Sequence, residues 1–187
     1  WNIRNTMSKV KFNLVGNTFT HLTNGNKGYS VHGKESKYIE WVGEDGEGTF
    51  YIDNTINQGI VDKKDGPKYL WLLESRFIKP GLVESIIDNR EAVEDAYETI
   101  FTHDQRLLAL GDKYKWCPAQ GFWIKDPKVY EKSKMISMIA SNKNMCEGHR
   151  LRLEWVDRIG DQLDLYGRGF KEIADKEEGL CDYMFSV

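Results

Sequence analysis

The chain has 187 residues, of which 40% are hydrophobic, and a formal net charge of −3 with acidic and basic residues interspersed. This length suffices for one complete domain and part of a second, and the lack of a basic stripe argues against nucleic acid as the main partner. No apolar run approaches the roughly 18–20 residues that span a bilayer, and no basic-then-apolar leader is present, so we expect no transmembrane segment and a cytoplasmic protein. The three cysteines, an odd number without Cys-x-x-Cys spacing, indicate reduced thiols and argue against a disulfide or zinc framework.

Short apolar runs separated by turn residues predict strands in the first part of the chain. Residues 10–15 form one such run, and residues 38–42 and 49–52 read as strands on either side of an acidic, glycine-containing turn. Residues 59–68 read as a charged loop, and residues 69–73 as a buried strand.

From residue 69 onward, strand and helix patterns alternate. The expected elements are helices from Pro80 and from about Asn89, a strand over 100–102, a short helix over 104–110 and a strand over 114–117. Such alternation predicts a mainly parallel sheet with helices on its faces.

A charged stretch, residues 126–134, marks the expected boundary between two domains. The apolar run that follows, residues 135–140, has the length of one strand and ends in a polar, glycine-containing loop that opens with Ser141 and Asn142. Their side chains are candidates for hydrogen bonds to a ribose or a phosphate. The alternative is that they end the strand and cap a turn.

A helix is expected from about Arg150 to Gly160, which occupies the position of a left-handed C-cap. A second apolar run, residues 163–166, is stopped by Gly167, where glycine permits a close backbone approach. This strand–loop–helix–strand unit places the helix start at the carboxyl end of the first strand, where backbone N–H groups and the helix dipole favour an anion. Arg150 at that helix start therefore indicates phosphate binding, and the alternative is an exposed ion pair with Glu154.

Other residues at strand ends have structural explanations. His103 and Asp104 follow a strand, and we expect a surface histidine beside an aspartate that caps a helix. Trp116, Phe122 and Trp123 are expected to pack in a core at the domain junction, the alternative being that they stack on a sugar ring. No spacing typical of metal ligands occurs, so no required metal is expected.

Three segments of the second part of the chain occur in the order and spacing of a known family. They are Ile139-Ala140-Ser141-Asn142, Arg150-Leu151-Arg152-Leu153 and Leu163-Asp164-Leu165-Tyr166-Gly167-Arg168. This pattern resembles the start of the donor-binding domain of glycosyltransferase family 10, the alpha-1,3-fucosyltransferases, which reads roughly VVSN…RxRLY…VDVFGR. The resemblance implies an α/β, Rossmann-like fold of the GT-B type with an incomplete second domain. Residues 7–131 would form the acceptor-side domain and residues 132–187 part of the donor domain.

The resemblance also implies an activity, the inverting transfer of fucose from GDP-fucose to a hydroxyl of a glycan, with no cofactor and no required metal. Ser141, Asn142, Arg150 and Arg168 would bind the donor, with the Arg150 guanidinium on its pyrophosphate. Glu74 lies where the family carries WxNFESP, and it would be the base that deprotonates the acceptor hydroxyl.

Read without the family, Glu74 is a solvated carboxylate or the ion-pair partner of Arg76, and the chain departs from the family pattern on either side of it, at Leu73 and Arg76. The alternative function is a non-catalytic carbohydrate- or nucleotide-binding α/β module. In the family, the strand that here begins at Asp182 continues into further donor-binding motifs. We therefore expect a fragment without transferase activity that self-associates through exposed strand edges.

Overall fold

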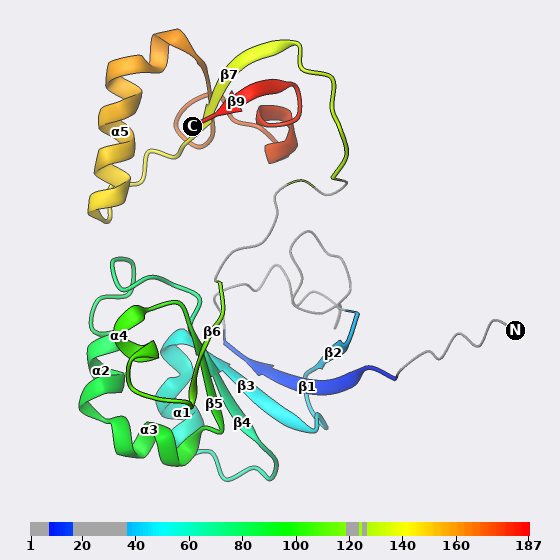
Figure 1. Ribbon diagram of the computed structural model, residues 1–187, viewed down its shortest axis with the longest axis vertical. Helices are drawn as coiled ribbons and strands as arrows, with labels where there is room; N and C mark the ends of the chain where they lie inside the picture. Colours follow the sequence, from blue (N-terminus) through cyan, green and yellow to red (C-terminus); the bar gives the residue numbers. More distant parts are fainter. Residues whose placement is uncertain (1–7, 17–36, 119–123, 125–126) are drawn as a thin grey trace, which may run out of the picture. The chain divides into compact units, whose positions relative to one another are not determined.

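A computed structural model of the chain describes residues 8–16, 37–118, 124 and 127–187. The described residues fall into two compact units, one within residues 1–121 and the other within residues 122–187 (Figure 1). Each unit contains its own sheet of parallel strands.

The first unit is built on a six-stranded sheet in the order β2-β1-β3-β4-β5-β6, in which every neighbouring pair is parallel. The strands are β1 (Val10–Val15), β2 (Ile39–Val42), β3 (Gly48–Ile52), β4 (Lys68–Trp71), β5 (Thr99–Thr102) and β6 (Tyr114–Trp116). Each strand begins and ends within two residues of its predicted position. The α/β class and the mainly parallel sheet predicted from the sequence are therefore confirmed.

Short helices connect the strands from β3 to β6, and Figure 1 shows them gathered on one side of the sheet. They are α1 (Ile56–Val61), which follows a 3₁₀ turn (Asp53–Thr55), α2 (Leu82–Asp88), α3 (Arg90–Ala96) and α4 (Gln105–Leu108). Their apolar side chains pack on one sheet face in a buried core made of Tyr51, Ile56, Leu70, Leu72, Val83, Ile86, Val93, Tyr97, Ile100, Leu107 and Tyr114. Tyr51, Leu70, Ile100 and Tyr114 are register partners in adjacent strands, which places them on the same face.

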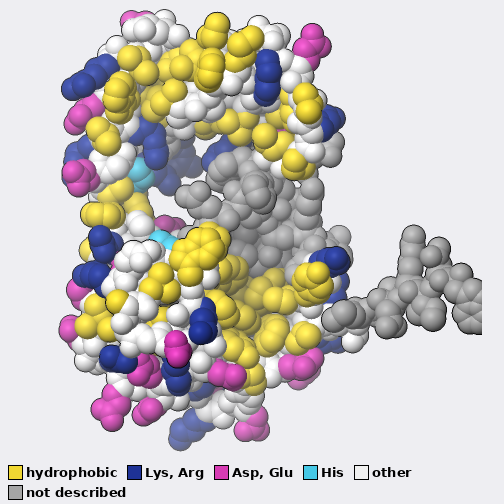
Figure 2. Space-filling model, viewed as in Figure 1, with side chains coloured by type: hydrophobic (Ala, Val, Ile, Leu, Met, Phe, Trp, Pro, Cys, Tyr) yellow, Lys and Arg dark blue, Asp and Glu magenta, His cyan; other side chains and the backbone are white. Residues whose placement is uncertain are grey.

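The opposite face of the sheet carries a cluster of aromatic side chains centred on Phe50. The Phe50 ring lies 5.3 Å from Phe12, 5.2 Å from Trp41, 4.8 Å from Tyr69 and 5.9 Å from Phe101, measured between centroids. Neighbouring positions of a strand alternate between the two faces, so Phe50 lies opposite the helical core. Figure 2 shows hydrophobic side chains gathered over the strands of this unit.

Helix α1 corrects the prediction of a charged loop that begins at residue 59, because the helix continues to Val61. Gly59 lies in its interior and is buried, and a Cβ there would overlap the hydroxyl oxygen of Tyr97. That hydroxyl donates a hydrogen bond of 2.7 Å to the carbonyl oxygen of Ile56. A glycine is thus required by packing at a position where local propensity argues against a helix.

Replacing Gly59 by alanine is expected to destabilise the first unit by about 1–3 kcal/mol, because the new methyl group must displace the Tyr97 ring and its hydrogen bond. Urea unfolding followed by tryptophan fluorescence measures the change. Gly43→Ala is the matched control, since no atom lies within 4 Å of a Cβ at that position. Equal unfolding midpoints for the two variants would contradict the packing of α1 against Tyr97.

The second unit is a three-stranded parallel sheet in the order β8-β7-β9. Its elements are β7 (Lys134–Ile139), α5 (Glu147–Ile159), a 3₁₀ turn (Gly160–Gln162), β8 (Asp164–Tyr166), a second 3₁₀ turn (Lys176–Gly179) and β9 (Tyr183–Ser186). The predicted strand–loop–helix–strand unit is therefore confirmed, with α5 between two parallel neighbours.

Two glycines of this unit had predicted conformations. Gly160 has φ −56° and ψ −33°, so the left-handed C-cap is wrong, because the chain continues from α5 directly into a right-handed 3₁₀ turn. Gly167 has φ +114°, and a Cβ there would overlap the carbonyl oxygen of Ala140. The close backbone approach predicted for Gly167 is confirmed.

Helix α5 covers its sheet loosely, since none of its residues is buried and Trp155 is 45% exposed. A groove of about 460 Å³ runs beside it, lined by Met138, Gly148, Leu151, Arg152, Trp155, Ile159 and Val187. None of the helices in the described ranges is long and apolar enough to cross a membrane.

Candidate functional site

Several polar residues of the first unit lie at the carboxyl edge of its sheet. Because the strands are parallel, the residues that follow β3, β4, β5 and β6 lie at the same edge, and they include Asp53, Glu74, His103, Asp104 and Cys117. In open parallel sheets ligands bind at this edge, beside the strand where the order reverses. Here the order reverses at β1, which lies between β2 and β3. The end of β3 is therefore the position at which a ligand is expected.

Asp53 directly follows β3 and is fully buried. Its φ of 44° lies in the left-handed region, which is uncommon for a residue other than glycine. Its Oδ1 accepts hydrogen bonds from the backbone N–H groups of Leu73 (2.8 Å) and Glu74 (3.3 Å), whereas its Oδ2 is buried without a hydrogen-bond partner in the described part of the chain. Burial raises the pKa of the Asp53 carboxyl, against the lowering effect of the two backbone hydrogen bonds, and the charge of Glu74 raises it further.

Glu74 lies three residues beyond the last residue of β4 and is half-buried. Its backbone N–H is bound to Asp53, but its carboxylate has no hydrogen bond or ion pair to another residue that the structure describes. Arg76, the partner considered for it from the sequence, pairs instead with Asp104 at 3.3 Å. The Glu74 carboxylate therefore lies at the carboxyl edge of the sheet and forms no ion pair with a residue in the described ranges.

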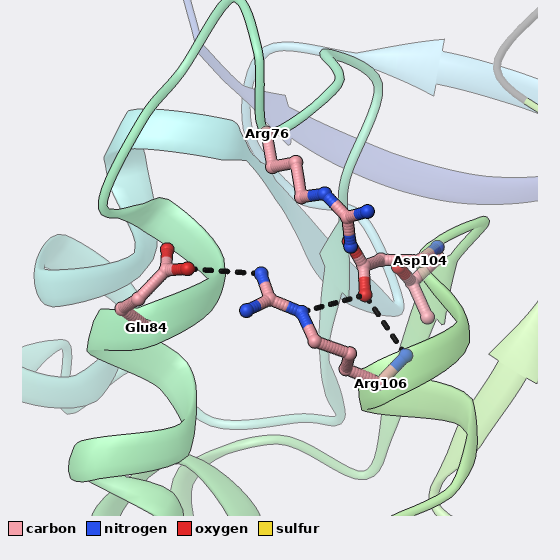
Figure 3. Close-up of polar contacts among 5 residues, drawn as sticks. Arg76, Glu84, Asp104 and Arg106 are labelled. Atoms are coloured by element: carbon pink, nitrogen blue, oxygen red, sulfur yellow. Dashed lines mark hydrogen bonds and ion pairs between the residues drawn. The ribbon is translucent and has the colours of Figure 1, made fainter.

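Asp104 lies between two arginines (Figure 3). Its Oδ2 is 3.3 Å from Nη1 of Arg76, and its Oδ1 is 3.6 Å from Nε of Arg106. A second nitrogen of Arg106, Nη2, lies 2.9 Å from Oε1 of Glu84. Oδ1 of Asp104 accepts the backbone N–H of Arg106 at 2.9 Å and caps α4, so the predicted capping role is confirmed.

Two other predictions concern residues at strand ends. His103 is half-buried, and its Nδ1 is buried without a hydrogen-bond partner in the described ranges, whereas the N–H of Asp104 donates a hydrogen bond to the Thr102 hydroxyl. The expected core position of Trp116 is wrong. Trp116 is 66% exposed and not part of a core, because it ends β6, the edge strand of the sheet. Phe122 and Trp123 lie outside the described residues.

In the second unit, three of the predicted donor-binding residues lie at the carboxyl edge of β7 and β8. The N–H of Asn142 donates a 3.0 Å hydrogen bond to the carbonyl oxygen of Arg168, which brings the two segments together. The side chains of Ser141, Asn142 and Arg168 make no hydrogen bond to another described residue. The hydrogen bonds by which the side chains of Ser141 and Asn142 would cap a turn are therefore not formed within the described ranges.

Arg150 is exposed in the first turn of α5, which begins three residues earlier than predicted, at Glu147. Its backbone N–H bonds to the carbonyl oxygen of Cys146 at 3.1 Å. The alternative ion pair with Glu154 is not formed, and no other ion pair of Arg150 occurs among the described residues. The structure thus leaves the Arg150 guanidinium accessible near the start of the helix.

Sequence reasoning missed a group of cations in this unit. Burial lowers the pKa of Lys176, and the positive charges of Arg152 and Lys143 lower it further. The three side chains come from α5, from the loop after β7 and from the 3₁₀ turn before β9. Lys143 could have been suspected because it lies in the predicted loop, but Lys176 carries no signal in its local sequence.

The described residues include no group of three or more His, Cys, Asp or Glu side chains placed to hold a metal ion. All three cysteines are free thiols, as predicted, and burial raises the pKa of Cys117. Comparisons of the chain with models of protein families, with curated proteins and with solved structures found no match.

Proposed function

We propose that the chain belongs to an inverting glycosyltransferase of the GT-B type that resembles the alpha-1,3-fucosyltransferases. The first unit would bind the glycan acceptor, and the second unit would bind GDP-fucose. The observation that carries the proposal is the placement of Glu74 at the carboxyl edge of a parallel sheet, with Arg76 paired to Asp104 and the Glu74 carboxylate uncommitted among the described residues.

In this reaction an acceptor hydroxyl oxygen forms a bond to the anomeric carbon of fucose on the face opposite the leaving group. The bond from that carbon to the phosphate oxygen breaks, and GDP leaves with its electron pair. Glu74 takes the proton of the hydroxyl, which raises the nucleophilicity of the oxygen as it attacks. A carboxylate without a competing cation partner suits this role, because an ion pair would lower its basicity.

The charge distribution of the second unit supports binding of a nucleotide diphosphate. Arg150 is exposed in the first turn of α5, and the helix dipole there favours negative charge. Lys143, Arg152 and Lys176 add positive charge to the same unit. Ser141, Asn142 and Arg168 would supply hydrogen bonds to the donor from the ends of β7 and β8.

Calorimetric titration with GDP, carried out on a form of the protein that contains the complete donor domain, tests the donor-binding part of the proposal. We expect GDP to bind with a dissociation constant below about 1 mM and GDP-fucose to compete for the same site, with UDP as the mismatched nucleotide. A transfer assay with GDP-fucose and a panel of glycans, carried out on a form of the protein that contains the complete donor domain, tests the chemistry. Equal heats for GDP and UDP, or no heat with either, would contradict the proposed donor.

A non-catalytic carbohydrate-binding module is the second candidate. The exposure of Trp116 at the end of β6 favours it, because an exposed aromatic ring next to polar groups is suited to stacking on a sugar. The substitution Glu74→Gln would leave glycan binding by such a module unchanged, whereas the transferase would lose turnover.

A further inference from the structure

The backbone N–H groups of Leu73 and Glu74, which follow β4, take no part in strand pairing. Strand β4 ends at Trp71, and the N–H of Leu72 still bonds to the carbonyl oxygen of Phe101 at 2.9 Å. The next hydrogen-bonded turn begins at Ser75, whose carbonyl accepts from residues 78 and 79. The N–H groups of Leu73 and Glu74 lie between these two structures and need another acceptor.

Asp53 supplies that acceptor from the neighbouring strand end. One oxygen, Oδ1, receives both N–H groups, at 2.8 Å from Leu73 and 3.3 Å from Glu74. The arrangement is costly for Asp53, which is fully buried, adopts a left-handed backbone and leaves Oδ2 without a partner in the described ranges. Such a costly arrangement is typical of residues that hold a functional segment in place.

We propose that Asp53 is a positioning residue, which anchors the backbone of Leu73 and Glu74 and thereby sets where the Glu74 carboxylate lies at the sheet edge. This role rests on the proposed function of Glu74. The direction in which the Asp53 pKa is shifted agrees with it, since burial and the charge of Glu74 both favour a neutral acid, and a neutral acid keeps Oδ1 as an acceptor without adding a buried charge next to the base.

Two substitutions separate the acceptor from the unusual backbone. Asp53→Asn keeps an oxygen that can accept both N–H groups, and asparagine tolerates the left-handed region. Asp53→Gly removes the acceptor while relieving the backbone strain. Asn13→Ala is the matched control, because Asn13 is a buried polar residue of β1 that bonds to Thr49 and Gly46.

Amide hydrogen exchange of the whole chain, read at Leu73 and Glu74, is the first measurement. We expect exchange at both amides to accelerate about tenfold in Asp53→Gly, and to stay within about twofold of the parent in Asp53→Asn and in Asn13→Ala. Unchanged protection in Asp53→Gly would overturn the proposal. If Asp53→Gly does not fold, a tenfold acceleration in Asp53→Asn would overturn it instead.

Fucose transfer, measured in a form of the protein that contains the complete donor domain, is the second measurement and separates the two proposals. We expect Asp53→Gly to lower kcat with little change in KM for the donor, and Asp53→Asn to restore most of the loss. An equal fall of kcat in Asn13→Ala would identify a merely structural role and overturn the positioning role. If exchange changes as expected but neither the parent nor any variant transfers fucose, the anchor is supported and the proposed function fails.

Discussion

In a form of the protein that contains the complete donor domain, Glu74→Gln is expected to lower the turnover of fucose transfer by about a hundredfold to ten-thousandfold, the usual contribution of a general base. The amide has the size of the carboxylate but cannot accept the proton of the acceptor hydroxyl. The Glu74 carboxylate has no partner among the described residues, so its replacement breaks no described ion pair or hydrogen bond, and stability should be unchanged. Affinity for GDP should also be unchanged.

The measurement is the transfer rate at saturating acceptor, combined with calorimetric titration of GDP. Glu98→Gln is the matched control, because Glu98 is an exposed glutamate that immediately precedes β5 at the opposite, amino edge of the same sheet. The control should retain the parental rate. A Glu74→Gln protein with parental turnover would remove Glu74 as the base and favour the binding-module function.

The strands were predictable because their signals are local. Apolar runs bounded by glycine, proline and charged residues locate all nine described strands to within about two residues, including β7 and β8 on either side of a helix. Helix α1 was missed because its interior Gly59 looks like a loop residue, and only the distant Tyr97 ring explains it. The end of α5 was misjudged because a glycine at a helix end is also compatible with a right-handed 3₁₀ turn.

The site was predictable only in part, and for a related reason. Glu74 could be located because it follows a recognisable buried strand. Asp53 could not, since its role depends on a hydrogen bond to a segment 20 residues further along the chain. The lowered pKa of Lys176 likewise depends on burial and on the charges of Arg152 and Lys143, which belong to other elements of the folded unit.

In the form with the complete donor domain, Arg150→Ala is expected to weaken GDP binding about tenfold to a hundredfold, which corresponds to the roughly 1.5–3 kcal/mol of a hydrogen bond to a charged group. Arg150 is exposed in the first turn of α5, where the helix dipole adds to its own positive charge. It makes no ion pair with a described residue, so its removal should leave the stability of the unit unchanged. Turnover at saturating donor should fall less than in Glu74→Gln.

Arg158→Ala is the matched control for this prediction, because Arg158 is an exposed arginine in the last turn of the same helix. Both substitutions change the net charge equally. A difference in GDP affinity between the two variants would therefore be due to the position of the arginine and not to the overall charge of the protein. Calorimetric titration at about 0.15 M salt screens the long-range contribution further. If the two variants bind GDP equally, the phosphate role of Arg150 should be abandoned.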